Sequence, residues 1–329
     1  MRKSFVRGTY EGTGAAANIS CGFQPDFVMF FNAEDGDVAG MWSTKVDSGS
    51  FDDTKGIGIS DDGSIHVAGI GSAGVSAYSG SSSAGEGFSL GTDATLNESG
   101  KDFTYWGFRS GDGRSGPVIS SYTGTGVAQN VEVGFVPYLL IVVDVTDGTN
   151  IVLWSEENSG FMADGKDINI VDDAVVGNAA NGITGYDGAD ASSGPGFTVG
   201  TDSEVNENAK TFVYIAFRED DLAFDGPVVG TFDVAGTPAA QNVQLGFQPS
   251  AVIITNAEDG DVVVFWSDTS QTYFDAGLGI VLDANIAGIS SDGVTAYAGS
   301  SATYSEGFTV GVDGSIGEAN KTYVYAAWR

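Results

Sequence analysis

The chain contains one unit written three times, with equivalent positions 112 residues apart. The segment CGFQPDFVMF that begins at Cys21 returns as VGFVPYLLIV at Val133 and as LGFQPSAVII at Leu245. Each copy closes on a similar aromatic segment: KDFTYWGFR, KTFVYIAFR and KTYVYAAWR. A tandem repeat of this length makes each copy a structural unit and argues against one large catalytic fold. We therefore expect three domains, covering residues 1–110, 111–220 and 221–329.

Residue usage and patterning within the unit favour β-structure. The 49 glycines, together with abundant Val, Thr, Ser and Phe, indicate short strands joined by tight turns. A continuous apolar run such as Phe27 to Phe31 is expected for a strand that is buried on both faces. The Asp35-Gly36 pair that follows it predicts a hairpin, whose second strand ends at Trp42. With about seven or eight strands per unit, the sequence predicts an all-β chain of three tandem β-sandwich domains, jelly-roll or immunoglobulin-like, of about 110 residues.

The middle of the unit differs most between the copies. Its length changes there, and length variation is typical of surface loops. Because these segments differ, each can meet a different neighbour, so we expect them to form the contact surface for partner molecules. They lie near 44–73, 156–181 and 268–292, and the linkers between units are expected near 110–116 and 219–226.

Charge excludes some partners. The net charge is -31, from 44 acidic and 13 basic residues, and such a chain repels nucleic acid. The excess of Asp over Glu and the scarcity of Lys fit a saline setting; an ordinary acidic protein is the alternative.

The apolar runs are too short to insert into a membrane. No apolar secretory segment opens the sequence, which predicts synthesis in the cytoplasm without export by that route.

Salt is expected to stabilise this protein. A net charge of -31 makes the compact state repel itself, and salt screens that repulsion. The melting temperature should therefore rise between low and molar salt, as measured by thermal unfolding. A flat or falling curve would remove the argument for a saline environment.

Three tryptophans and six basic residues recur at equivalent positions. Each tryptophan ends a strand beside an apolar run, so we expect it to pack inside its own domain, where replacement by alanine costs about 3–5 kcal/mol. The basic residues have two interpretations: a ligand site for an anion or sugar, or ties between the last strand and an acidic neighbour. The second is favoured, although such exposed pairs are individually weak. These residues are Trp42, Trp154, Trp266, Lys101, Lys210, Lys321, Arg109, Arg218 and Arg329.

Groups for catalysis are sparse, and we predict no catalytic residue. His66 is the only histidine and is not repeated, while Cys21 is replaced by Val and Leu in the other copies and is expected to be a small core residue. The acidic Asp-Gly turns could hold Ca²⁺, the one cofactor suggested, although an ordinary acidic turn is favoured. Those carboxylates are Asp35, Asp37, Asp259 and Asp261.

One aromatic residue in each copy is a candidate for glycan contact. It stands beside a Gly/Ser-rich loop, where a ring could serve as a platform for a sugar. The alternative is a half-buried strand residue, the more common role of tyrosine in such a position. These residues are Tyr78, Tyr186 and Tyr297.

Three segments of the unit carry a resemblance to known proteins. They are GTYEGTGAAANISCGFQPDFVMF from Gly8, GEGFSLGTD from Gly85 and YVYAAWR from Tyr323. The unit resembles repeats found in virion proteins of marine and halophilic tailed viruses. In those repeats Ile-Lys usually follows the apolar strand, whereas Phe30-Phe31 stands here. The resemblance implies a β-sandwich structural module and carries over no catalytic residue.

These observations predict a non-enzymatic virion structural protein, either a capsid decoration or turret protein or a tail-associated one. It would be made in the host cytoplasm, and its expected partners are other virion proteins of the capsid or tail. The alternative is a carbohydrate-binding adhesion module that contacts a glycan on the host surface. A homo-oligomer is compatible with either function.

Overall fold

Each repeat folds into one eight-stranded antiparallel sheet in the computed structural model of the chain. Most of the two linkers lies outside the residues that the structure describes. None of the helices in the described part of the chain has the length or apolar character needed to span a bilayer. The described residues are 3–46, 49–52, 54–61, 63–111, 116–157, 159–189, 194–218, 226–300 and 305–329.

The strands recur in the same order in each repeat. Repeat 1 contains β1 (Phe5–Glu11), β2 (Ala17–Ser20), β3 (Phe27–Asn32), β4 (Val38–Ser43), η1 (Gly49–Phe51), β5 (Lys55–Asp61), β6 (Ile65–Tyr78), β7 (Gly87–Leu90), α1 (Ala94–Asn97) and β8 (Asp102–Phe108). Repeat 2 contains β9 (Val118–Thr123), β10 (Gln129–Glu132), β11 (Leu139–Asp144), β12 (Ile151–Ser155), η2 (Gly160–Met162), β13 (Lys166–Val171), β14 (Ala174–Tyr186), β15 (Gly196–Val199), α2 (Ser203–Asn206) and β16 (Thr211–Phe217). Repeat 3 contains β17 (Val228–Asp233), β18 (Gln241–Gln244), β19 (Ala251–Asn256), β20 (Val263–Ser267), β21 (Leu278–Leu282), β22 (Ile286–Tyr297), β23 (Gly307–Val310) and β24 (Thr322–Trp328).

The sheet of each repeat curls almost into a barrel. In repeat 1 the strand order is β1-β8-β3-β4-β5-β6-β7-β2, so the first two strands of the chain form opposite edges of the sheet. Only residues 12–16 join these edges, which forces the sheet to bend around until they approach each other. The all-β fold in three tandem units is confirmed. The facing halves of the curled sheet enclose an interior as two layers of a sandwich do.

The central strand of each sheet is buried on both faces, as its apolar run predicts. In β11, Leu140 and Val142 point into the interior of their own barrel. The alternate residues Leu139, Ile141 and Val143 belong to a second core, which combines residues of all three repeats. Since side chains alternate along a strand, one strand serves both cores. The predicted β3–β4 hairpin is also present, with Phe27 opposite Ser43.

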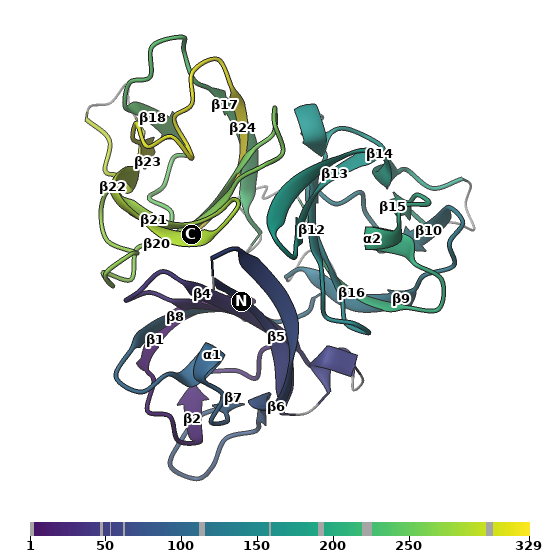
Figure 1. Ribbon diagram of the computed structural model, residues 1–329, viewed down its shortest axis with the longest axis vertical. Coiled ribbons are helices and arrows are strands. Elements are labelled where there is room, and N and C mark those ends of the chain that lie inside the picture. The colour runs from purple at the N-terminus through teal and green to yellow at the C-terminus, as the bar shows by residue number, and fades with distance from the viewer. Residues whose placement is uncertain are drawn as a thin grey trace.

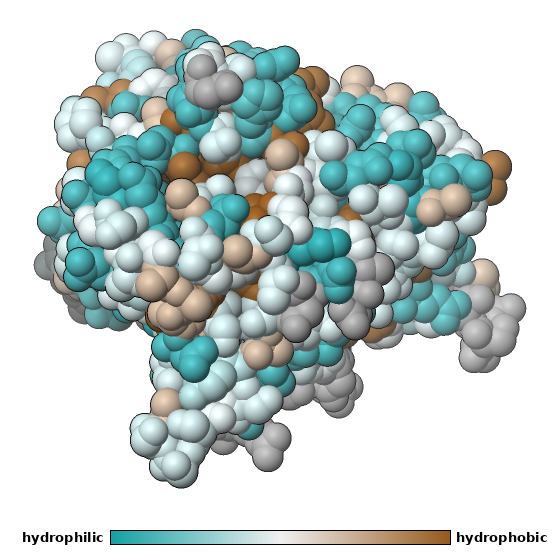
Figure 2. Space-filling model, turned by 60° about the horizontal axis from the view of Figure 1, so that its bottom comes forward, coloured by the Kyte–Doolittle hydropathy of each residue, from teal (hydrophilic) through white to brown (hydrophobic). Residues whose placement is uncertain are grey.

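The three barrels surround the shared core (Figure 1). At one end of this core the last residues of β8, β16 and β24 meet. These are Phe108, Phe217 and Trp328, each 1% exposed, and their ring centroids are 5.4–6.0 Å apart. The chain thus forms a pseudo-threefold body whose centre belongs to no single repeat. In Figure 2 hydrophobic side chains show mainly in recesses between hydrophilic lobes.

The expectation that the variable middle segments are surface loops is wrong. They form the hairpins β5–β6, β13–β14 and β21–β22, whose tips meet at the centre of the molecule. There the Asp173 amide donates to the Ile65 carbonyl at 2.6 Å, and the Val175 amide donates to the Asp283 carbonyl at 3.0 Å. Each of these hairpins packs against another repeat of the same chain, while many of its side chains remain exposed.

Candidate functional sites

The three repeats are joined head to tail by an equivalent hydrogen bond at each junction. The Ser50 amide of repeat 1 donates to the Val145 carbonyl of repeat 2 at 2.6 Å. The corresponding bonds run from Phe161 to Ala257 at 2.6 Å, and from Tyr273 back to Ala33 at 2.8 Å. Since the third bond returns to the first repeat, the contacts close a ring, as heterologous contacts do when their rotation closes.

Glycine–glycine contacts explain how the junctions fit so closely. The glycine of each acidic Asp-Gly turn lies against a glycine of the neighbouring hairpin. A Cβ on Gly260 would lie 2.6 Å from the Cα of Gly177, and one on Gly36 would lie 2.9 Å from the Cα of Gly288. At the remaining junction a Cβ on Gly148 would lie 3.1 Å from the Gly69 nitrogen. The turn predicted to close a hairpin therefore also docks the next repeat.

Substitution of Gly260 by alanine should loosen one junction of the ring. Gly260 has a φ of +69°, so alanine is strained there in addition to clashing with the next repeat. Gly246→Ala is a matched control: Gly246 has a φ of +82°, and no described residue beyond its chain neighbours comes within 4 Å of where a Cβ would stand. We expect Gly260→Ala to destabilise the protein by about 1–3 kcal/mol more than Gly246→Ala in denaturant unfolding. Equal losses would mean that the contact adds nothing.

Each recurring lysine forms an ion pair with the acidic turn of its own repeat. Lys101 Nζ lies 2.7 Å from Asp35 Oδ2, Lys321 Nζ lies 2.6 Å from Asp259 Oδ2, and Lys210 pairs with Asp147. The hydrogen bond to Asp35 raises the pKa of the Lys101 ammonium. The lysines therefore tie the last strand to the turn, as the structural interpretation of these residues expects.

The same ion pairs occupy the turns proposed for calcium. Asn32 Nδ2 contacts Asp35 at 3.3 Å and Asp37 at 3.0 Å, and Asn256 contacts Asp259 and Asp261 in the same way, at 3.2 Å each. An amide thus already donates to both carboxylates of each turn, and an ammonium pairs with one of them. Among the described residues, no three His, Cys, Asp or Glu side chains gather in a way that could hold a metal. The ordinary acidic turn accounts for these four aspartates.

The recurring arginines stack on the phenylalanine of the Gly-Phe-x-Pro segment. The guanidinium carbon of Arg109 lies 4.3 Å from the centre of the Phe23 ring, and the Arg329–Phe247 distance is 4.5 Å. Arg218 lies farther from Phe135, at 5.9 Å. A cation over an aromatic face is attracted by the ring, so these contacts fix the segment that leads into the central strand.

The recurring tryptophans and tyrosines differ in exposure. Trp42, Trp154 and Trp266 are buried, with 3%, 0% and 2% of their surface exposed. The tyrosines end the strands β6, β14 and β22 and are half-buried. Each therefore belongs to a different barrel, and the structure brings them to no common platform. They are Tyr78, Tyr186 and Tyr297.

We predicted no catalytic role for the single cysteine and the single histidine. Both make contacts of a structural kind. Cys21 is partly buried, its Sγ lies 3.1 Å from the Phe23 carbonyl, and burial raises the pKa of its thiol. His66 Nδ1 lies 3.5 Å from Asp172 of the second repeat. The carbonyls of Glu86 and Glu306 accept backbone bonds, as that of Pro195 does. Since the backbone makes this contact, the side chain there is free to differ.

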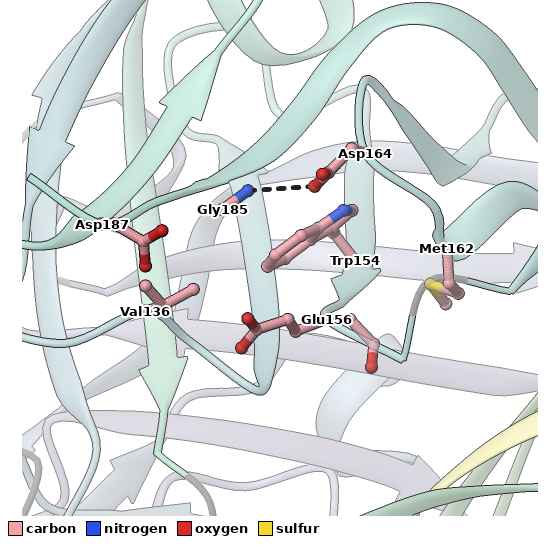
Figure 3. Close-up of a pocket in the computed structure, with 8 residues that line it drawn as sticks. Val136, Trp154, Glu156, Met162, Asp164, Gly185 and Asp187 are labelled. Atoms are coloured by element: carbon pink, nitrogen blue, oxygen red, sulfur yellow. Dashed lines mark hydrogen bonds between the residues drawn. The ribbon is translucent and has the colours of Figure 1, made fainter.

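Repeat 2 has a polar cavity of about 210 Å³ beside Trp154 (Figure 3). Its wall includes the carboxylates of Glu156, Asp164 and Asp187, and Asp164 accepts a bond from the Gly185 amide at 3.3 Å. A Cβ on Gly185 would lie 3.0 Å from Val136 and 3.5 Å from Trp154, so glycine leaves this space open. The cavity is acidic, and the Trp154 ring, fully buried, offers no face for stacking.

A second polar group lies inside the barrel of repeat 2, where the sequence patterns predict none. Asp167 is 0% exposed, Asn169 5% and Asn150 3%, although their barrel is otherwise lined by apolar side chains. Burial, followed by the charge of Asp202, raises the pKa of the Asp167 carboxyl to about 7. A residue-by-residue comparison of the three copies could have found this group, because it replaces glycine and aliphatic residues of the other repeats.

Comparison with known proteins gives this chain no family. No protein-family model matches it, and no curated protein matches it either. Its function has to be argued from the ring and from the groups described above.

Proposed function

We propose that the protein is a non-enzymatic structural component of a virion, a capsid decoration or turret protein or a tail-associated one. The resemblance of its repeats to those of virion proteins points to this setting. The closed ring with its shared core is the observation that supports a structural role for the chain. Such a body presents three similar outer surfaces in a fixed relation, which suits a partner with threefold symmetry.

Three fixed contacts strengthen weak binding. When one repeat engages the partner, the other two are held at a high effective concentration near their own sites. No contact has to be strong by itself, and the acidic surface keeps the free protein from binding nucleic acid. The partners would be other virion proteins.

The test is the location and stoichiometry of the chain in purified particles. Heads and tails are separated, and each fraction is probed with an antibody to the chain. A capsid role predicts the chain on tail-less heads, with one copy for each threefold site, as counted by quantitative mass spectrometry. Retention on tails alone would select the tail-associated role. Absence from both fractions would overturn the proposal.

A second candidate is a carbohydrate-binding adhesion module on the host surface, in which the exposed part of each recurring tyrosine would contact a glycan. The tyrosines stand at the ends of their strands, one in each barrel. This candidate predicts binding on a glycan array that is lost when Tyr78, Tyr186 and Tyr297 are all replaced by alanine. Glycan cleavage by the purified chain would contradict both candidates.

A further inference from the structure

The cavity beside Trp154 exists because repeat 2 has a glycine where the other repeats have alanine. Gly185 is paired with the phenylalanine of the next strand, and the same pairing is made by Ala77 in repeat 1 and by Ala296 in repeat 3. A Cβ on Gly185 would lie 3.0 Å from Val136 and 3.5 Å from Trp154. The glycine therefore leaves open a space that the alanines occupy in the other copies.

A second replacement widens the same space. Met162 lines the cavity and directly follows the residue whose amide makes the junction bond. The residues at this position in the other two repeats are phenylalanines, Phe51 and Phe274. Since two copies fold with larger side chains at both positions, the fold itself does not require the opening in repeat 2.

Carboxylates replace uncharged side chains at the mouth of the cavity. Glu156, Asp164 and Asp187 line it and are exposed, so solvent reaches the cavity. Figure 3 shows these carboxylates around the indole ring of Trp154. In repeat 3 the positions of the two aspartates are held by alanines, Ala276 and Ala298. The cavity of repeat 2 therefore favours a ligand with positive charge and hydrogen-bond donors.

The indole nitrogen supplies a donor of its own. Trp154 is 0% exposed, and its Nε1 has no hydrogen-bond partner, whereas Nε1 of Trp266 in repeat 3 donates to the Asp275 carbonyl at 3.2 Å. Nε1 of Trp42 is also unpaired, but the larger residues of repeat 1 leave less space beside it. A buried N–H without a partner is costly, so a ligand that offers an acceptor gains from this contact.

We propose that this cavity binds a small organic cation that also carries hydroxyl groups, of the amino-sugar class. The ammonium of the ligand donates to the three carboxylates, and a hydroxyl oxygen accepts from Nε1 of Trp154. A metal ion is not the ligand, because the described His, Cys, Asp and Glu side chains form no group that could hold one. The volume of about 210 Å³ is below the roughly 300–1,000 Å³ of drug-sized pockets, so a single sugar ring is the largest ligand expected.

This site is independent of the proposed role of the ring in a virion. It also differs from the tyrosine contacts of the carbohydrate-binding candidate, because Tyr78, Tyr186 and Tyr297 do not line the cavity. The buried indole offers its nitrogen, not its face, so the sugar is held by hydrogen bonds without stacking.

Calorimetric titration of D-glucosamine into the full chain, at a pH that keeps the sugar amine protonated, tests the proposal. We expect one ligand per chain, with millimolar affinity because solvent screens the exposed carboxylates. D-glucose has a hydroxyl in place of the ammonium, and butylamine has the ammonium without hydroxyls. Each should bind at least about tenfold more weakly than glucosamine. In NMR spectra, one of the five tryptophan indole N–H resonances should shift on binding.

Two variants locate the ligand. Gly185→Ala places a methyl group in the cavity, and Asp164→Asn removes one charge while keeping the shape of the side chain. Each should weaken glucosamine binding at least about tenfold. Gly71→Ala, in strand β6 of repeat 1, is the matched control: no described residue beyond its chain neighbours comes within 4 Å of where a Cβ would stand. It should bind as the wild type does.

Four results would overturn the proposal. Absence of binding in concentrated glucosamine would remove the site, and equal binding of D-glucose would remove the role of charge. Equal binding of butylamine would leave a simple cation site and contradict the amino-sugar class. Unchanged affinity in Gly185→Ala would place the ligand elsewhere. Because alanine stands at this position in two repeats, the circular dichroism spectrum of Gly185→Ala should remain that of the wild type, which separates lost binding from lost folding.

Discussion

Replacement of Trp328 by alanine is expected to destabilise all three repeats together, by about 3–5 kcal/mol. The Trp328 ring lies within 6.0 Å, between centroids, of Phe108 in repeat 1 and within 5.4 Å of Phe217 in repeat 2. Its removal leaves a cavity where the three barrels meet. Differential calorimetry should show one transition in the wild type and one transition at lower temperature in the variant.

Tyr297→Ala is the control for this experiment. It also removes a large ring from repeat 3, but from a half-buried position at the end of β22. We expect a smaller loss of stability from it. If Trp328→Ala instead produced an early transition that contained only repeat 3, the repeats would be independent domains and the shared core would contribute little to their coupling.

The second large effect concerns pH and Asp167. Burial raises the pKa of this carboxyl from 3.8 to about 7. Because the pKa is higher in the folded state, the stability that protonation contributes is fully present below about pH 4 and is lost as the pH rises through about 7. The loss can reach on the order of 4 kcal/mol.

Asp167→Asn keeps the side chain neutral and should remove this dependence. The variant should gain stability relative to the wild type as the pH rises from 4 to 8, as measured by urea unfolding at each pH. Asp187→Asn, at an exposed position of the same repeat, is the control and should follow the wild type. A constant difference between Asp167→Asn and the wild type at every pH would contradict the assignment.

Local patterns in the sequence identify much of the fold. The apolar run Phe27 to Phe31 predicts a strand buried on both faces, and Asp35-Gly36 predicts the hairpin that follows; both are present. The ring could not be predicted in this way, because the run does not reveal whether its second face is covered by its own unit or by another repeat. That information lies in contacts between distant residues, such as Phe31 with Phe265.

The middle hairpins were predicted as loops because their length differs between the copies, and in repeat 1 glycine also obscures the strand pattern. Gly56 and Gly58 interrupt the strand pattern of β5, although the packing favours a small residue there. A Cβ on Gly58 would lie 2.8 Å from the Thr95 methyl group, because the short helix α1 covers this part of the strand. The lysine pairs were easier to predict, since Lys101, Lys210 and Lys321 recur at nearly the same distance in sequence from their acidic turns.

The closed ring has a consequence for how the molecule responds to dilution. Three separate subunits with these contacts would dissociate as their concentration fell, since their stability would depend on mass action. Here covalent linkage makes ring closure a step of folding, with a rate and an equilibrium that do not depend on how many molecules are present. A single copy released into a large volume therefore retains all three junctions.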